Sequence, residues 1–171
     1  MTRELLSIKE IVNLGILLCD VFDYITKIKK KEKLGDKIKY PQIPSILSES
    51  LAIHLLNKKI ILSELERFRF DFGGRTADIL ANKNEEKIKI EVKATAKSAF
   101  QYFGPKDIVA DYIIWIHFED FFMDLEKNIV KIFIIKNPGK YFEKPVKITL
   151  SKLKQVIGED LEEKEINVDQ L

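Results

Sequence analysis

Hydrophobic residues in the first third of the chain recur with helical periods. Residues 3–28 place apolar side chains three, four and seven positions apart, which predicts one long amphipathic helix with Thr2 as its N-cap. A second helix is predicted from Ser45, which can cap it, to about Asn57, because prolines interrupt the chain just before it. A lysine-rich connector with seven lysines, residues 27–39, lies between the two helices.

The second predicted helix carries an acid on its apolar side. The helical neighbours of Glu49 are all apolar: Ile46, Ala52, Ile53 and Leu56. These positions share one face of a helix, so the Glu49 side chain is expected to point into the core. A buried carboxyl group needs a partner, a proton or a metal.

From Glu66 the hydrophobic period changes to two. Phenylalanines at 68, 70 and 72 alternate with charged residues, which predicts a half-buried strand that ends at Gly73-Gly74. Two more strands, residues 76–81 and 87–94, are joined by the turn-prone residues 82–85. Together they predict a three-stranded antiparallel meander.

The rest of the chain continues an alternation of helices and strands. Residues 95–110 are predicted to be helical with a break at Gly104-Pro105, and residues 112–118 to form a strand covered on both faces. A helical crossover would make that strand parallel to the third strand of the meander. The further elements predicted are strands at 130–135 and 146–150, a short helix at 151–157, and a mobile acidic tail at 159–171.

Composition fits one globular domain. The 171 residues are 46% hydrophobic and 33% charged, and the apolar stretches fall short of the roughly 20 residues that a membrane helix needs. No secretory signal is recognised, so a cytoplasmic location is expected. Cys19, the single cysteine, is interpreted as a small core residue. Outside the acidic tail 28 bases face 21 acids, which permits a polyanionic partner.

The candidate chemistry centres on two acids and a lysine in the predicted hairpin. Glu91 and Lys93 share one face of the third strand, although acid-x-lysine tripeptides also occur at 85–87 and 162–164. A hairpin that is symmetric about the Asn84/Glu85 peptide places Asp78 opposite Glu91, with the two Cβ atoms about 5 Å apart. Two carboxylates at that distance repel each other, so a divalent cation or a shared proton is expected between them.

Oxygen ligands favour hard cations, so Mg²⁺ is expected, with Mn²⁺ as its substitute. Asp78, Glu91 and the Val92 carbonyl are the expected ligands. One cysteine and two distant histidines, His54 and His117, do not make a zinc site, and both histidines are interpreted as packed or surface residues. No organic cofactor is expected. The ion would polarise a phosphate and activate a water, and Lys93 would orient that water, help deprotonate it or neutralise developing charge.

These residues resemble the PD-(D/E)XK nuclease superfamily, which includes type II restriction endonucleases and Holliday-junction resolvases. The resemblance rests on Gly73 to Ile79, followed by Glu91-Val92-Lys93, after a helix that bears Glu49. It covers about residues 45–118. It implies an α/β fold with a restriction-endonuclease-like αβββαβ core and a mixed central sheet flanked by helices, here with the long N-terminal helix added. The chain departs from the family pattern at Ala77, where the superfamily name has proline.

The resemblance also implies roles for individual residues. Asp78 and Glu91 would hold the metal, Lys93 would be the catalytic lysine, and Glu49 the helix acid near a second metal position. A polar residue on the helix after the motif is often present in members, and Lys97, Ser98 and Gln101 are candidates. The catalytic core is expected at residues 45–135 of a single nuclease domain spanning 1–171, with residues 1–40 forming the N-terminal helix and connector.

Three functions are compatible with this sequence. The first is a type II restriction endonuclease that acts on DNA as a homodimer, with the N-terminal helix as a possible dimer interface. The second is a structure-selective nuclease, such as a junction resolvase or repair enzyme, and the third is an inactive nucleic-acid-binding domain. About 44 residues precede the acid-bearing helix, which favours the first. Arg75 is a candidate for phosphate contact, and base readout is expected from the lysine segment, residues 100–106 or residues 119–128.

Overall fold

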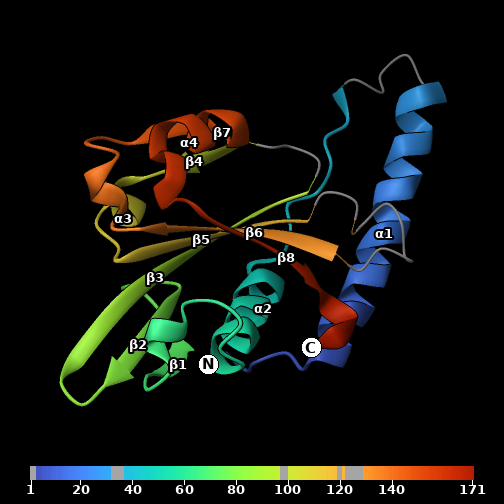
Figure 1. Cartoon of the computed structure of the whole chain (residues 1–171). Helices are drawn as coiled ribbons and strands as arrows, with labels where there is room; N and C mark the ends of the chain where they lie inside the picture. Colours follow the sequence, from blue (N-terminus) through green and yellow to red (C-terminus); the bar gives the residue numbers. More distant parts are fainter. Residues whose placement is uncertain (1–2, 32–36, 97–99, 119–120, 122–128) are drawn as a thin grey trace.

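The central element of the computed structural model is a twisted six-stranded sheet, with helices on both of its faces (Figure 1). The structure describes residues 3–31, 37–96, 100–118, 121 and 129–171. The helices are α1 (Ile8–Lys31), α2 (Ser45–Asn57), α3 (Pro105–Ile108) and α4 (Leu150–Ile157). The strands are β1 (Arg69–Phe72), β2 (Ile79–Lys83), β3 (Glu86–Thr95), β4 (Phe100–Phe103), β5 (Tyr112–His117), β6 (Ile129–Lys136), β7 (Val146–Thr149) and β8 (Glu162–Asn167).

The strand order of the large sheet is β1-β2-β3-β5-β6-β8, while β4 and β7 form a separate two-stranded sheet. All neighbours in the large sheet are antiparallel except β3 and β5, which are parallel. The predicted meander and the parallel strand that follows it are therefore confirmed. The fold is mixed α/β, with a long N-terminal helix as expected.

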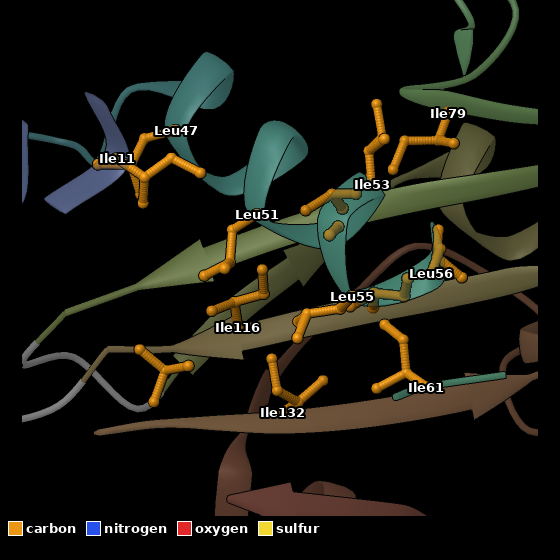
Figure 2. Close-up of a cluster of buried hydrophobic side chains, with 14 of the residues drawn as sticks. Ile11, Leu47, Leu51, Ile53, Leu55, Leu56, Ile61, Ile79, Ile116 and Ile132 are labelled. Carbon is orange, nitrogen blue, oxygen red and sulfur yellow. The ribbon is translucent and has the colours of Figure 1, made fainter. Parts of the chain in front are cut away.

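Successive side chains of the central strands point to opposite faces of the sheet, and apolar side chains pack on both faces. Ile114 and Ile116 of β5 belong to a core cluster shared with α1 and α2, whereas Ile113 and Trp115 belong to a second cluster shared with α4. Figure 2 shows side chains of α2, including Leu51, lying over the sheet in the first cluster. The prediction that residues 112–118 form a strand covered on both faces is confirmed, because a strand between two cores has no polar side.

The long N-terminal helix begins later than its periodicity indicates. Its first residue is Ile8, and Ser7 caps it: Ser7 Oγ accepts from the Glu10 N–H at 3.3 Å, and Glu10 Oε2 accepts from the Ser7 N–H at 2.8 Å. This reciprocal pair is a capping box. Thr2, the predicted cap, lies outside the described residues. Ser45 is the first residue of α2 rather than its cap, which is Pro44.

Two predictions about the second half of the chain were wrong. Residues 100–103 are not helical but form β4, because they pair with β7 almost fifty positions later. The acidic tail is not a mobile appendage, because β8 pairs with β6 along the edge of the large sheet. Its charges are compensated locally: Lys154 Nζ lies 2.7 Å from Glu163 Oε2. The local sequence gives no signal for either of these strand pairings, because both partners are far apart in the chain.

Cys19 is buried as expected. Within the described part of the chain, no helix has the length and hydropathy to cross a membrane.

Candidate active site

The hairpin of β2 and β3 brings the two predicted acids together. Ile79 pairs with Ile90 and Leu80 with Lys89, so the next positions outward are Asp78 and Glu91. This is the predicted register, and it is confirmed. Because β2 begins at Ile79, Asp78 lies where β3 loses its neighbour on this side and the edge of β3 becomes open.

A tight turn between β1 and β2 positions Asp78. The Gly73 N–H donates to the Asp78 carbonyl at 3.0 Å. A Cβ atom at Gly73 would lie 2.6 Å from the carbonyl oxygen of Ala77, so only glycine fits there without a shift of the backbone. Gly74 has a φ of +64°, in the left-handed region that glycine adopts without strain. Buried Ala77, where the superfamily name has proline, is part of this close contact.

At the open edge of β3 the Asp78 carboxylate accepts a backbone hydrogen bond that a neighbouring strand would otherwise accept. Its Oδ2 accepts from the Val92 N–H at 2.9 Å. In an extended strand the N–H and C=O of one residue point to the same side, so the Val92 carbonyl also faces this edge. Ala94 lies two residues after Val92 and faces the same open edge, where its carbonyl accepts a hydrogen bond from Gln101 Nε2 at 3.0 Å. The predicted oxygen ligands thus converge on one place.

A cation already lies beside the two carboxylates. The ammonium of Lys106, from α3, is 3.2 Å from Glu91 Oε1 and 3.7 Å from Asp78 Oδ1. The sequence predicted a divalent ion or a shared proton in this position, because neighbouring carboxylates repel each other. The structure shows that one positive charge fits between the two oxygens, and Lys106 supplies it.

Lys93 is held by a second residue of α3. Its Nζ lies 2.7 Å from Oδ1 of the buried Asp107, whose Oδ2 accepts from the Gly104 N–H at 2.7 Å. Sequence analysis missed both Lys106 and Asp107 as site residues. A signal was present, because Gly104-Pro105 marks a helix start and a carboxylate three residues after an N-cap commonly bonds back to its N–H.

The electrostatics of the site centre on Glu91, which is buried although it adjoins the open edge. Burial and, after it, the Asp78 charge raise the pKa of Glu91 to about 7, against the opposing effect of Lys106. A carboxyl group with a pKa near neutrality holds a proton unless a cation stabilises its charged form. A cation that binds beside Glu91 at neutral pH therefore stabilises the charged carboxylate and displaces this proton.

Glu49 is buried, as its helical neighbours predicted, and its partner is Arg3. Arg3 Nη1 lies 2.5 Å from Glu49 Oε2. Burial and then the Asp78 charge raise the pKa of Glu49, and Arg3 lowers it. Glu49 thus interacts electrostatically with Asp78, but its direct contact is an ion pair with the segment before α1.

The donor set suits magnesium better than a metal that needs many protein ligands. Among the described residues no three acids, histidines or cysteines form a metal-binding group. Mg²⁺ commonly takes one or two carboxylates and fills its other positions with water and phosphate oxygens. Asp78, Glu91 and the Val92 carbonyl match that requirement, and the ammonium between the carboxylates shows that the space accepts positive charge.

No known family model, curated protein or solved structure matches this chain.

The structure describes two of the four residues predicted to contact DNA, Arg75 and Gln101. Arg75 is exposed in the turn before Asp78. The amide of Gln101 is used by the protein itself, through its bond to the Ala94 carbonyl. Lys97 and Ser98 lie outside the described residues, as does most of the segment 119–128 and part of the lysine-rich connector.

The histidines have structural partners, as expected. His54 Nε2 lies 2.6 Å from the Leu6 carbonyl oxygen. Buried His117 shares a hydrogen bond of 2.8 Å with Thr95 Oγ1, which also accepts from Trp115 Nε1.

We expect the metal-free protein to lose stability as the pH rises from about 4.5 to 7. The Glu91 pKa is 4.5 in its reference state and about 7 when folded, so the folded protein binds the proton more tightly over that range. Glu91→Gln should remove this loss, making the variant more stable than the parent by about 3 kcal/mol at pH 8 and equal at pH 4.5. Urea unfolding in EDTA measures the difference, with exposed Glu86→Gln as the control. Equal pH dependence in the parent and Glu91→Gln would contradict the assignment.

We expect Lys106→Met to bind Mn²⁺ more tightly, on the order of tenfold, because a metal between the carboxylates no longer competes with an ammonium. Isothermal titration with Mn²⁺ measures the affinity. Exposed Lys87→Met, on the same strand as Glu91, is the matched control for the loss of one positive charge. Unchanged or weaker binding by Lys106→Met would show that the two cations do not share one position.

Proposed function

We propose that this protein is a magnesium-dependent DNA endonuclease of the PD-(D/E)XK type. The observation that carries the proposal is the meeting of Asp78 and Glu91 around one cation position at an open strand edge, with Lys93 two residues from Glu91. Metal-dependent hydrolysis of a phosphodiester needs oxygen ligands for the metal and a group that activates water or stabilises charge. The two carboxylates and the Val92 carbonyl supply the oxygens, and the Lys93 amine supplies the second group.

Each residue has a separate task in this mechanism. Asp78, Glu91 and the Val92 carbonyl would hold the metal. A Mg²⁺ ion held there would supply Lewis-acid polarisation of the scissile phosphate and activation of water. Lys93, positioned by Asp107, orients the attacking water and stabilises the negative charge that develops on the phosphate. Lys106 neutralises the carboxylates in the metal-free protein and would have to leave this position for a metal ion to bind.

The order of elements around the site supports the same proposal. A helix with a buried acid, α2, precedes three antiparallel strands, β1 to β3. A crossover then leads to β5, which is parallel to β3. This order is compatible with the αβββαβ core expected for the superfamily, and it differs from that core because the crossover contains β4 as well as the short helix α3.

A restriction-type enzyme would require a second copy of the chain, because two identical sites cut both strands of a palindrome. The long helix α1 supports this part of the proposal. Leu17, Val21 and Tyr24 are exposed at helical spacing on its outer side. We propose that they contact the same residues of a second copy. Sedimentation equilibrium checks this, and a monomer at micromolar concentration would contradict it.

A structure-selective nuclease is the second candidate. It is favoured by the exposed aromatic side chains of β4 next to the open edge, because such residues suit unpaired bases rather than duplex sequence readout. An inactive nucleic-acid-binding domain is the third candidate. The retention of Asp78, Glu91 and Lys93 together argues against it.

Purified protein incubated with plasmid DNA and with a synthetic four-way junction, in Mg²⁺ or in EDTA, tests the proposal. Discrete linear fragments support a restriction enzyme, and paired nicks at the junction support a resolvase. Cleavage in Mg²⁺ that stops in EDTA is the expected result. If a folded protein that binds Mn²⁺ cuts neither substrate, the endonuclease proposal is wrong.

A further inference from the structure

A groove of about 470 Å³ runs along the open edge of β3, beside the candidate active site. One wall contains Val92 to Ala96 and therefore includes Lys93. Phe100 to Tyr102 of β4 form a second, aromatic wall, and the remaining lining residues lie in the segment 41–43 and in the first turn of α2. Whatever occupies this groove would contact the Lys93 region and the aromatic strand at the same time.

The aromatic wall of the groove faces solvent. Phe100 and Tyr102 are each 50% exposed, whereas Phe103 on the same strand is fully buried. The two exposed rings alternate along β4 and therefore share one face of the small sheet. Lys147 of β7 pairs directly with Tyr102, so an exposed ammonium group accompanies the rings on that face. Large exposed rings in pairs commonly mark a contact surface.

Charge indicates what the surface contacts. Among the described residues that line the groove, Lys93 is the only charged one; its ammonium is paired with Asp107, and no acid lines the groove. Lys147 adds a second positive charge beside Tyr102. A partner with flat apolar faces and negative charges would match this combination, and a nucleic-acid strand has both.

The spacing of the rings distinguishes an unpaired strand from a duplex. Residues two apart on a strand are separated by roughly 7 Å, whereas stacked bases in B-DNA lie about 3.4 Å apart. Base faces inside a duplex are covered by their neighbours, so an aromatic ring reaches a base face only when that base is unstacked. Phe100 and Tyr102 thus suit bases that are spread apart, as they are in a single strand.

We propose that the groove holds single-stranded DNA, with bases stacked on Phe100 and Tyr102 and the backbone passing Lys93. The inference rests on the proposed function for the position of the cut phosphate. It narrows the substrate to DNA with an unpaired segment beside the cut, such as a flap, a splayed junction arm or a single strand.

Binding of fluorescein-labelled single-stranded and duplex 20-mers, measured by anisotropy in EDTA, tests this inference without cleavage. The parent protein should bind the single strand more tightly than the duplex. The double variant F100A/Y102A should lose at least about fivefold in single-strand affinity, because stacking on one ring typically contributes that much or more. Its duplex affinity should change less than twofold.

Three further variants separate stacking from general effects. F100L/Y102L keeps apolar bulk without rings and should lose affinity as F100A/Y102A does, whereas F100W/Y102W should bind at least as tightly as the parent. V109A removes a different exposed apolar side chain and should bind normally. Equal single-strand affinity in the parent and F100A/Y102A, or an equal loss on duplex, would overturn the inference.

The outcome is independent of the test for cleavage. Ring-dependent binding of single strands without any cleavage would contradict the nuclease proposal and leave the groove as a binding site. Cleavage of duplex plasmid with no effect of the ring variants would support the nuclease proposal and contradict the assignment of the groove to single-stranded DNA.

Discussion

Asp78→Asn should abolish magnesium-dependent cleavage, with a fall of at least ~10³-fold in rate, because removal of a metal-binding charge removes several kcal/mol of transition-state stabilisation. The substitution keeps the size of the side chain, and its amide oxygen can still accept from the Val92 N–H as Asp78 Oδ2 does. The local fold should therefore be retained. Single-turnover cleavage of the best substrate from the plasmid and junction assay gives the rate, and circular dichroism checks the fold.

The matched control is Asp71→Asn. Asp71 is an acid of the same meander, but its ion pair is with exposed Arg69 on the edge strand β1. Its loss should change the rate less than threefold. Titration with Mn²⁺ adds a readout other than activity, because Asp78→Asn should weaken metal binding and Asp71→Asn should not. Full activity of Asp78→Asn would show that the metal site is misplaced.

Lys93→Met should reduce the cleavage rate by about 10²- to 10⁴-fold, the range expected when a group that moves a proton or stabilises charge at a reacting centre is lost. Metal binding should be largely retained, since Lys93 pairs with Asp107 rather than with Asp78 or Glu91. The combination of normal Mn²⁺ affinity and lost cleavage is the signature of a catalytic role. Lys89→Met, on the same face of β3, is the control.

Asp107→Asn tests whether Asp107 positions Lys93. It removes the counter-charge of the lysine but keeps an oxygen that can accept from the Gly104 N–H. We expect a smaller loss of rate than for Lys93→Met, on the order of tenfold. An Asp107→Asn protein that cuts as fast as the parent would show that the lysine needs no such support. If Lys93→Met itself retains full activity, the proposed mechanism fails.

The sequence alone determined the local geometry of the site. A period of two along residues 87–94 placed Glu91 and Lys93 on one strand face, and a symmetric turn placed Asp78 opposite Glu91. The apolar neighbours of Glu49 correctly predicted its burial. These results could be predicted because strand alternation, turn symmetry and helical spacing are short-range properties of a backbone with few allowed conformations.

Tertiary structure alone decided which groups neutralise those acids. Lys106 reaches Glu91 from α3, and Arg3 reaches Glu49 across 46 positions of sequence. The pairing of β4 with β7 and that of β6 with β8 also join segments that are far apart in the sequence. Contacts of this kind leave no periodic pattern, because they depend on how whole elements pack against one another and any of 25 lysines could have supplied the charge.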